Sequence, residues 1–208
     1  MIRGILFSLS CLITSSAIAG QVEGTAAFAK GEYALALQEF KKSAEQGDLI
    51  SQTLLGLMYK EGKGTKQDFT QAKHWLLKAA NKGEAKAQNS LGTMFRVGLG
   101  VAQDYTQAAS WTLKAASQGD SGSQNDMGNY YYNGQGVTQD YSQASVWYSR
   151  AAAQGHKGSQ NMMGEMYEEG IGVEQDYKKA AQFYTLAAKQ GFEAAKENLE
   201  NLKEKLRN

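Results

Sequence analysis

One period of 36 residues constrains this chain more than any other feature of its sequence. It separates the glycines Gly56, Gly92, Gly128 and Gly164 without insertion or deletion. The same step separates four aspartates and five further glycines: Asp68, Asp104, Asp140 and Asp176, and Gly47, Gly83, Gly119, Gly155 and Gly191. A fixed period of this size is typical of repeat proteins. We therefore expect four full repeats, over residues 48–83, 84–119, 120–155 and 156–191.

Each repeat predicts two helices. In the first, Leu55, Gly56 and Tyr59 and their equivalents form one face at i, i+1 and i+4. A glycine inside a helix costs about 1 kcal/mol relative to alanine, so its recurrence predicts a close approach of two helices. The second helix carries small residues and one large aromatic: Phe69, Ala72, Trp75, Leu76, Ala79 and Ala80, then Tyr105, Ala108, Trp111, Leu113, Ala115 and Ala116. The fold class is all-α, an α-solenoid of stacked antiparallel helical hairpins.

Glycines and aspartates mark the helix ends. Gly62, Gly98, Gly134 and Gly170 stand where a helix ends in a left-handed residue, and a second glycine two places on lets the chain turn back. The four periodic aspartates then stand at helix N-caps. Gln71, Gln107 and Gln143 follow three residues later and predict an aspartate version of the capping box, whereas the last repeat has Lys179.

The first 19 residues predict a signal peptide. Arg3 precedes an apolar stretch, and Ala17-Ile18-Ala19 is a small-x-small cleavage site. We expect cleavage after Ala19 and a periplasmic or secreted mature chain that begins at Gly20. A lipid anchor on Cys11 is the alternative. The apolar stretch is shorter than the roughly 20 residues of a membrane span, and no later segment comes closer, so no transmembrane segment is predicted.

The remaining ends of the chain differ from the full repeats. Residues 20–47 predict an N-terminal segment and a half repeat, because only 32–47 match the second half of a repeat. Residues 192–208 predict a capping helix, with Glu200 where each full repeat has its glycine. Proline is absent, so we expect one continuous body without a rigid linker.

Composition excludes several classes of function. Cleavage removes Cys11, the single cysteine, and leaves no thiol for a disulfide, a metal or catalysis. Of the 22 basic side chains Arg3 is also removed, so 21 remain against 21 acidic ones. With no net field to attract phosphate backbones, nucleic acid is not an expected partner.

The repeat pattern resembles the Sel-one-like repeat (SLR) family, which is related to the tetratricopeptide repeat (TPR). The resemblance rests on "LG-x-MY-x-x-G-x-G" (55–64), "QNSLGTMF" (88–95), "NMMGEMYEEGIGVEQDYKKA" (161–180) and the recurring "W…AA…G". It covers residues 32–191. It implies an α-solenoid with a concave face and a role in binding other proteins, often in bacterial envelopes. It implies no reaction.

No motif predicts a catalytic, cofactor or metal site. The Gly-x-Gly pairs lack a third glycine and a preceding strand, so they do not fit a phosphate-binding loop. His74 and His156 occupy variable positions that we expect to face solvent. The tryptophans at 75, 111 and 147 suggest a stacking ladder for sugars or bases, but core packing explains them better. Binding or hydrolysis of β-lactams, suggested for cysteine-rich relatives, is a weaker alternative because the paired cysteines are absent.

Two functions follow from the resemblance: an exported scaffold that binds a peptide or protein, and a periplasmic immunity protein that neutralises a toxin. In either case we expect a monomer without cofactors. The binding surface is placed on the first helices, which line the concave side, whereas His74 and Ser110 lie on the convex side. The predicted protein-binding residues are Thr53, Leu57, Lys60, Asn89, Thr93, Arg96, Asn125, Asn129, Tyr132, Asn161, Glu165 and Glu168.

Within this set, asparagine recurs at 89, 125 and 161. Its amide suits the backbone of an extended peptide. The alternative is that these asparagines only join neighbouring helices. The positions around them change from basic (Lys60, Arg96) to acidic (Glu165, Glu168), which favours a role in specificity.

Overall fold

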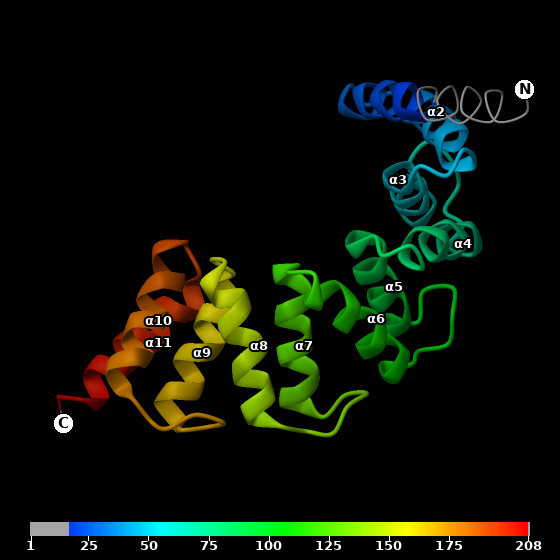
Figure 1. Ribbon diagram of the computed structural model, residues 1–208. Helices are drawn as coiled ribbons and strands as arrows, with labels where there is room; N and C mark the ends of the chain where they lie inside the picture. Colours follow the sequence, from blue (N-terminus) through cyan, green and yellow to red (C-terminus); the bar gives the residue numbers. More distant parts are fainter. Residues whose placement is uncertain (1–16, 208) are drawn as a thin grey trace, which may run out of the picture. The chain divides into compact units, whose positions relative to one another are not determined.

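The computed structural model describes residues 17–207, which consist of helices and turns without a strand (Figure 1). The chain divides into two compact units, with the boundary between Gln103 and Asp104. We call them unit 1 and unit 2. The expectation of one continuous body is thus not met, although no proline-rich linker separates the units. In repeat proteins each repeat contacts only its neighbours, so compact units can follow one another without a linker.

The helices agree with the predicted repeats. Unit 1 contains a helix over 17–29, then α2 (Tyr33–Glu45), α3 (Leu49–Glu61), α4 (Phe69–Ala80) and α5 (Ala85–Val97). Unit 2 contains α6 (Tyr105–Ser117), α7 (Ser121–Asn133), α8 (Tyr141–Ala153), α9 (Lys157–Glu169), α10 (Tyr177–Lys189) and α11 (Glu193–Lys205). Consecutive helices pack against each other within each unit, and α3 also contacts α5 as α9 contacts α11. The predicted all-α solenoid fold of stacked hairpins is confirmed.

Aspartate N-caps begin the second helices, as predicted. The carboxylate of Asp68 accepts a hydrogen bond of 2.9 Å from the backbone N–H of Gln71, and the other three periodic aspartates do the same. In a capping box the backbone N–H of the N-cap residue bonds to the side chain three residues later. Here that N–H has a different acceptor. The backbone N–H of Asp68 donates to the carbonyl of Tyr59 at 2.9 Å, which lies on the preceding helix. This bond fixes the loop between the two helices of a hairpin.

Glycines end the helices in the predicted left-handed conformation. Gly62 has φ 69°, and its equivalents in the other repeats lie between 66° and 74°. The second glycine of each loop has an additional purpose. A Cβ at Gly64 or Gly136 would collide with the carbonyl of Tyr33 or Tyr105, at the start of the second helix one repeat earlier. The loop therefore rests on the preceding repeat.

The glycines inside the first helices lie at close helix contacts, as predicted. A Cβ at Gly56 would lie 2.7 Å from Cγ of Leu76, and a Cβ at Gly128 would lie 2.5 Å from the ring of Tyr148. The filling residue is thus the one after the tryptophan. In the second repeat that residue is Thr112, which is buried, whereas the predicted Leu113 is 39% exposed. Assigning Leu113 to the apolar stripe was wrong by one position.

Tryptophans 75 and 147 are buried, as predicted for core residues, and 111 is partly buried. Each lies next to a cation three residues later. The distances to the ring centroids are 4.4 Å for Lys78, 3.9 Å for Lys114 and 4.5 Å for Arg150. Each distance is short enough for a cation–π contact.

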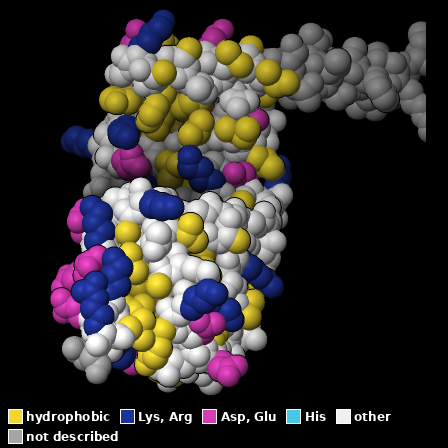
Figure 2. Space-filling model, turned by 90° about the vertical axis from the view of Figure 1, so that its left-hand side faces the viewer, with side chains coloured by type: hydrophobic (Ala, Val, Ile, Leu, Met, Phe, Trp, Pro, Cys, Tyr) yellow, Lys and Arg dark blue, Asp and Glu magenta, His cyan; other side chains and the backbone are white. Residues whose placement is uncertain are grey.

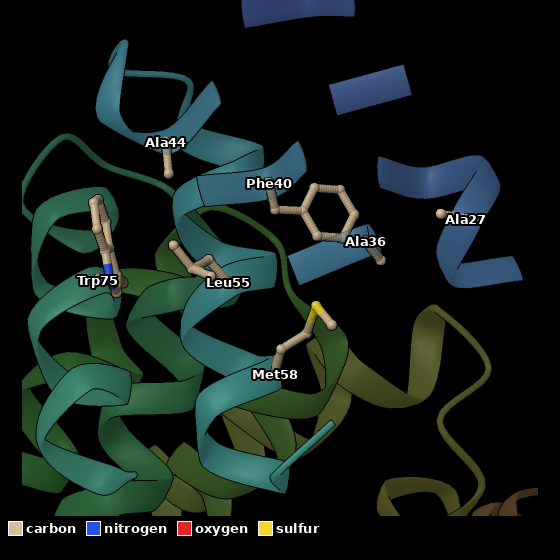
Figure 3. Packing of buried hydrophobic residues seen from close by; sticks show 7 residues of the cluster. All are labelled: Ala27, Ala36, Phe40, Ala44, Leu55, Met58 and Trp75. Atoms are coloured by element: carbon tan, nitrogen blue, oxygen red, sulfur yellow. The ribbon is translucent and has the colours of Figure 1, made fainter. Parts of the chain in front are cut away.

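The N-terminal half repeat is completed by a helix that the sequence did not predict. The helix over 17–29 packs on α2, so that a Cβ at Gly24 would lie 2.7 Å from the ring of Phe40. Figure 3 shows Phe40 between Ala27 of this helix and α3. The predicted cleavage after Ala19 falls inside this helix, while the rest of the predicted signal peptide, residues 1–16, lies outside the described residues.

Glutamine side chains join consecutive repeats in unit 2. Nε2 of Gln154 donates to the carbonyl of Gly119, which ends the preceding repeat, at 3.0 Å, and to Oε1 of Gln124 at 2.7 Å. Gln190 makes the same two bonds to Gly155 and Gln160. We call this arrangement the glutamine clamp. It gives each of the last two repeats a polar contact to the one before it.

The last helix, α11, covers the end of unit 2. Ala195 and Leu202 are buried against α10, and Glu200 is exposed, with an ion pair of 2.7 Å to Lys203. Where a full repeat has a glycine against a partner helix, α11 therefore presents a charged side chain to solvent. This arrangement agrees with the predicted capping helix.

Candidate protein-interaction surface

A groove of about 390 Å³ opens on unit 1 between the helix over 17–29, α3 and α5. Three of the predicted binding residues line it: Leu57, Lys60 and Asn89. The sequence did not single out its other lining residues, which are Phe28, Leu54, Met58, Glu61, Lys63, Lys86 and Ser90. The volume lies at the lower end of the roughly 300–1,000 Å³ typical of ligand sites.

The floor of the groove is apolar. Phe28, Leu54 and Leu57 are half-buried, and Met58 is buried in the core of unit 1. Phe28 packs on that core and also meets the ring of Tyr33 edge-on, with centroids 5.2 Å apart. Because these side chains are held by the core on one side, the floor is a formed surface rather than one that a partner must assemble.

The rim of the groove is basic. Lys63 forms an ion pair of 2.8 Å with Glu61, which raises the pKa of Lys63, and its Nζ lies 5.3 Å from the ring centroid of Phe28. Among residues 17–207, neither Lys60 nor Lys86 has a carboxylate partner. Figure 2 shows hydrophobic side chains gathered on the part of the molecule next to the grey N-terminal residues, with lysine and arginine side chains beside them. The groove thus carries positive charge that unit 1 does not neutralise.

The other predicted residues of unit 1 lie outside the groove lining. Thr53 is buried and donates both to the carbonyl of Leu49 at 2.9 Å and to Oε2 of Glu84 at 3.0 Å, so it joins α3 to the N-cap of α5. Thr93 and Arg96 are half-buried on α5. Thr53, predicted as a binding residue, therefore connects two helices of unit 1.

In unit 2 the corresponding residues form hydrogen bonds within the unit. Oδ1 of Asn125 accepts a hydrogen bond of 2.9 Å from the Ser159 hydroxyl, which joins α7 to α9. Oδ1 of Asn129 accepts one of 2.8 Å from the hydroxyl of Tyr148, the side chain that fills the space at Gly128. Burial raises the pKa of Tyr148 far above its ordinary value.

This network continues to α11. Asn161 is buried and donates to Glu165 at 2.7 Å, and Nδ2 of Asn198 donates to both residues at 3.2 Å. Glu168 accepts a hydrogen bond of 2.9 Å from the Tyr184 hydroxyl and contacts Lys205 at 3.3 Å. The asparagine series in unit 2 thus ties helices together.

Tyr132 stands at the end of α7, next to the loop that leads to α8. It is half-buried, its ring meets Tyr141 edge-on with centroids 5.1 Å apart, and burial raises its pKa. Its carbonyl accepts a hydrogen bond of 2.9 Å from Gln139. Tyr132 therefore braces the loop between α7 and α8.

The two histidines differ in their surroundings. His74 is exposed on α4, as predicted. His156 was expected to face solvent, but it is the N-cap of α9, where Nδ1 accepts a hydrogen bond of 3.1 Å from the Ser159 N–H. Asp48, Glu84 and Asp120 cap the other first helices in the same way. Because the residue type at this position varies between repeats, the sequence did not reveal that it is an N-cap in every one of them.

Residues 17–207 contain no group of three or more His, Cys, Asp or Glu side chains placed to bind a metal ion. None of the helices in this range combines the length and apolar character that crossing a bilayer requires.

Stacked hairpins, glycine-mediated helix contacts and repeating caps together define an α-solenoid repeat protein. The family model described as Sel1 repeat matches residues 49–84, 85–120, 121–156 and 158–192. The chain belongs to the Sel1 repeat (SLR) family. Comparison with curated proteins gave no match.

Several solved structures are similar to the chain. A protective antigen of uropathogenic Escherichia coli that displays an SLR fold is 34% identical, with a TM-score of 0.83 over 90% of this chain. A Sel1 repeat protein from Oxalobacter formigenes is 36% identical, with a TM-score of 0.76 over 80% of this chain. The matches span 40% and 49% of the lengths of those two chains. An immunity protein from Pseudomonas aeruginosa shares the fold at 24% identity, with a TM-score of 0.55, over 86% of this chain and 67% of its own.

Proposed function

We propose that the chain is an exported, non-enzymatic scaffold that binds a peptide or protein through the first-helix face of unit 1. The groove carries this proposal, because it combines a formed apolar floor with two lysines that have no acidic partner in unit 1. Formed grooves with a few polar groups over an apolar lining are the usual form of binding sites. The equivalent face of unit 2 uses its polar groups internally.

Site-specific photocrosslinking in intact cells tests the binding surface. A photoreactive residue at Leu57 lies in the groove, and one at Leu113, which is exposed on α6, is the matched control. We expect Leu57 to give one dominant crosslinked protein, identified by mass spectrometry, and Leu113 to give none above background. Crosslinking only from second-helix positions such as His74 or Ser110 would contradict the proposal.

Export belongs to the same proposal and rests on the Ala17-Ile18-Ala19 site. We expect the protein isolated from the periplasm or the medium to begin at Gly20, as measured by intact mass. A chain that starts at a lipid-modified Cys11 would replace the cleaved, soluble form with an anchored one.

A periplasmic immunity protein remains the second candidate, supported by the fold that the chain shares with the immunity protein from Pseudomonas aeruginosa. The crosslinking experiment separates the two functions by the identity of the partner. In the immunity case the partner is a toxin, and the purified chain inhibits it. In the scaffold case the partner is an envelope protein whose activity does not harm the cell.

A further inference from the structure

We propose that the unit 1 groove selects an extended segment in which one large apolar side chain is flanked by acidic residues. This inference rests on the proposed function, because it assumes that the groove is a protein-binding site, and it adds the chemistry of the partner.

The apolar floor favours a partner that contributes an apolar side chain. Leu54 and Leu57 stand one helical turn apart on α3, with Phe28 on the neighbouring helix, and all three are half-buried. A leucine or phenylalanine from a partner would remove the remaining apolar surface of these side chains from water. At about 390 Å³ the groove accommodates a short segment rather than a folded element.

The positive charge of the rim favours a partner that carries carboxylates. Lys60 and Lys86 lie in the lining of the same groove, on α3 and α5, without an acidic partner among residues 17–207. A partner with acidic residues on both sides of its apolar side chain would supply a carboxylate to each lysine. Charge-assisted hydrogen bonds of this type are stronger than neutral ones, and complementary charge favours one partner over others.

The carboxylate of Glu61 does not disfavour an acidic partner. Its carboxylate is paired with Lys63 at 2.8 Å, and the same ammonium lies over the rings of Phe28 and Tyr33 at 5.3 and 5.9 Å. The single glutamate of the lining is therefore already neutralised, and Lys60 and Lys86 set the charge of the groove. A basic segment would therefore be repelled by both lysines, because no carboxylate of the lining neutralises them.

The test uses the purified full-length protein and three labelled peptides, followed by fluorescence anisotropy. The peptides are GEELEEG, GEESEEG without the apolar side chain, and GKKLKKG with reversed charge. We expect GEELEEG to bind at least about tenfold more tightly than either of the others. Equal affinity for GEELEEG and GEESEEG would overturn the proposal, because the floor would then contribute nothing.

Variants locate the binding. Lys60→Glu with Lys86→Glu is expected to weaken GEELEEG by about tenfold or more, whereas the charge-matched control Lys41→Glu with Lys66→Glu, at exposed positions away from the groove, changes it less than about twofold. Leu57→Ser and the exposed control Leu35→Ser test the floor in the same way. Circular dichroism of each variant verifies that the fold is retained. Equal weakening by a variant and its control would overturn the proposal.

Two further outcomes separate the alternatives. A partner crosslinked from Leu57, together with failure of GEELEEG to bind, would leave the proposed function standing and refute the acidic and apolar chemistry. Absence of crosslinking from Leu57 would refute the proposed function itself. Self-association in analytical ultracentrifugation that the Lys60→Glu, Lys86→Glu variant abolishes would identify a second copy of the chain as the occupant and overturn the proposal.

Discussion

Unit 1 and unit 2 are built from the same hairpin but use the inner face of their first helices differently. At Gly56 in unit 1, the residue that fills the space is Leu76, which has no polar group, and Lys60, on the same helix, has no acidic partner among residues 17–207. In unit 2 the filling residues are Tyr148 and Tyr184, whose hydroxyls bond to Asn129 and Glu168. The comparison shows that, where the filling residue is a tyrosine, polar residues of the first helix bond internally to its hydroxyl, whereas beside Leu76 no such bond is available.

The largest expected effect concerns the glycine contacts. Gly128→Leu should destabilise the protein by about 3 kcal/mol, because the Tyr148 ring that it meets is held by Asn129 and cannot move aside. Gly56→Leu should cost less, about 2 kcal/mol, since Leu76 has no hydrogen bond that fixes it, although the Ala72 carbonyl also lies 3.2 Å from the added Cβ. Urea unfolding followed by tryptophan fluorescence measures both. Equal costs would show that the hydroxyl does not fix the tyrosine.

A smaller effect on stability is expected at alkaline pH, where the two buried tyrosines of unit 2 are tested. Burial raises the pKa of both Tyr148 and Tyr184, and the bond to Glu168 raises the latter further. These groups therefore stabilise the fold fully below the ordinary tyrosine pKa of about 10. Above it each contributes a loss of about 1.4 kcal/mol per pH unit, because the unfolded chain ionises first.

The control for this titration is the double variant Tyr148→Phe, Tyr184→Phe. It should be less stable at neutral pH by about 1 kcal/mol for each lost hydrogen bond, and its stability should fall less steeply between about pH 10 and about pH 11. Melting temperature against pH measures both slopes. An identical slope for the parent and the variant would mean that these tyrosines ionise as easily in the folded chain as in the unfolded one.

The smallest effect is expected at the N-caps of the first helices. His156→Asp should stabilise unit 2 by about 0.5–1 kcal/mol, because aspartate is a better N-cap and is also favoured by the helix dipole. The reciprocal change Asp48→His should destabilise unit 1 by a similar amount. Thermal melting of the two single variants provides the comparison, and a gain in stability from Asp48→His would refute the equivalence of the two sites.

Sequence periodicity predicted the helices and their ends because the same physical requirement recurs in every repeat. Left-handed loop residues, N-caps and close helix contacts each demand one residue type, so Gly62, Asp68 and Gly56 could be assigned from spacing alone. The helix over 17–29 could not be assigned, since its loop to α2 is shorter, which places Gly24, the glycine that packs on Phe40, 32 residues before Gly56 instead of 36.

The candidate site was only partly predictable for a different reason. Leu57 and Lys60 stood out because their positions vary between repeats, and Asn89 stood out because asparagine recurs at its position. Phe28 comes from the segment without a repeat pattern, and its place beside α3 is a tertiary fact. The internal bonds of Asn161 depend on Asn198, which lies 37 residues later on a helix predicted only as a cap. Periodicity shows which positions are equivalent, but it does not show which neighbouring residue each of them contacts.

The glutamine clamp has a consequence for how such chains change length. Gln154 reaches back 35 residues to Gly119, and Gln190 reaches back by the same number to Gly155, so each clamp depends only on the repeat before it. Duplication or loss of a whole 36-residue block would leave every other clamp intact, whereas insertion of a single residue within a block would move the glutamine away from its acceptor. Gene duplication in whole repeats is therefore the tolerated route to longer relatives, such as those of which this chain spans 40% and 49%.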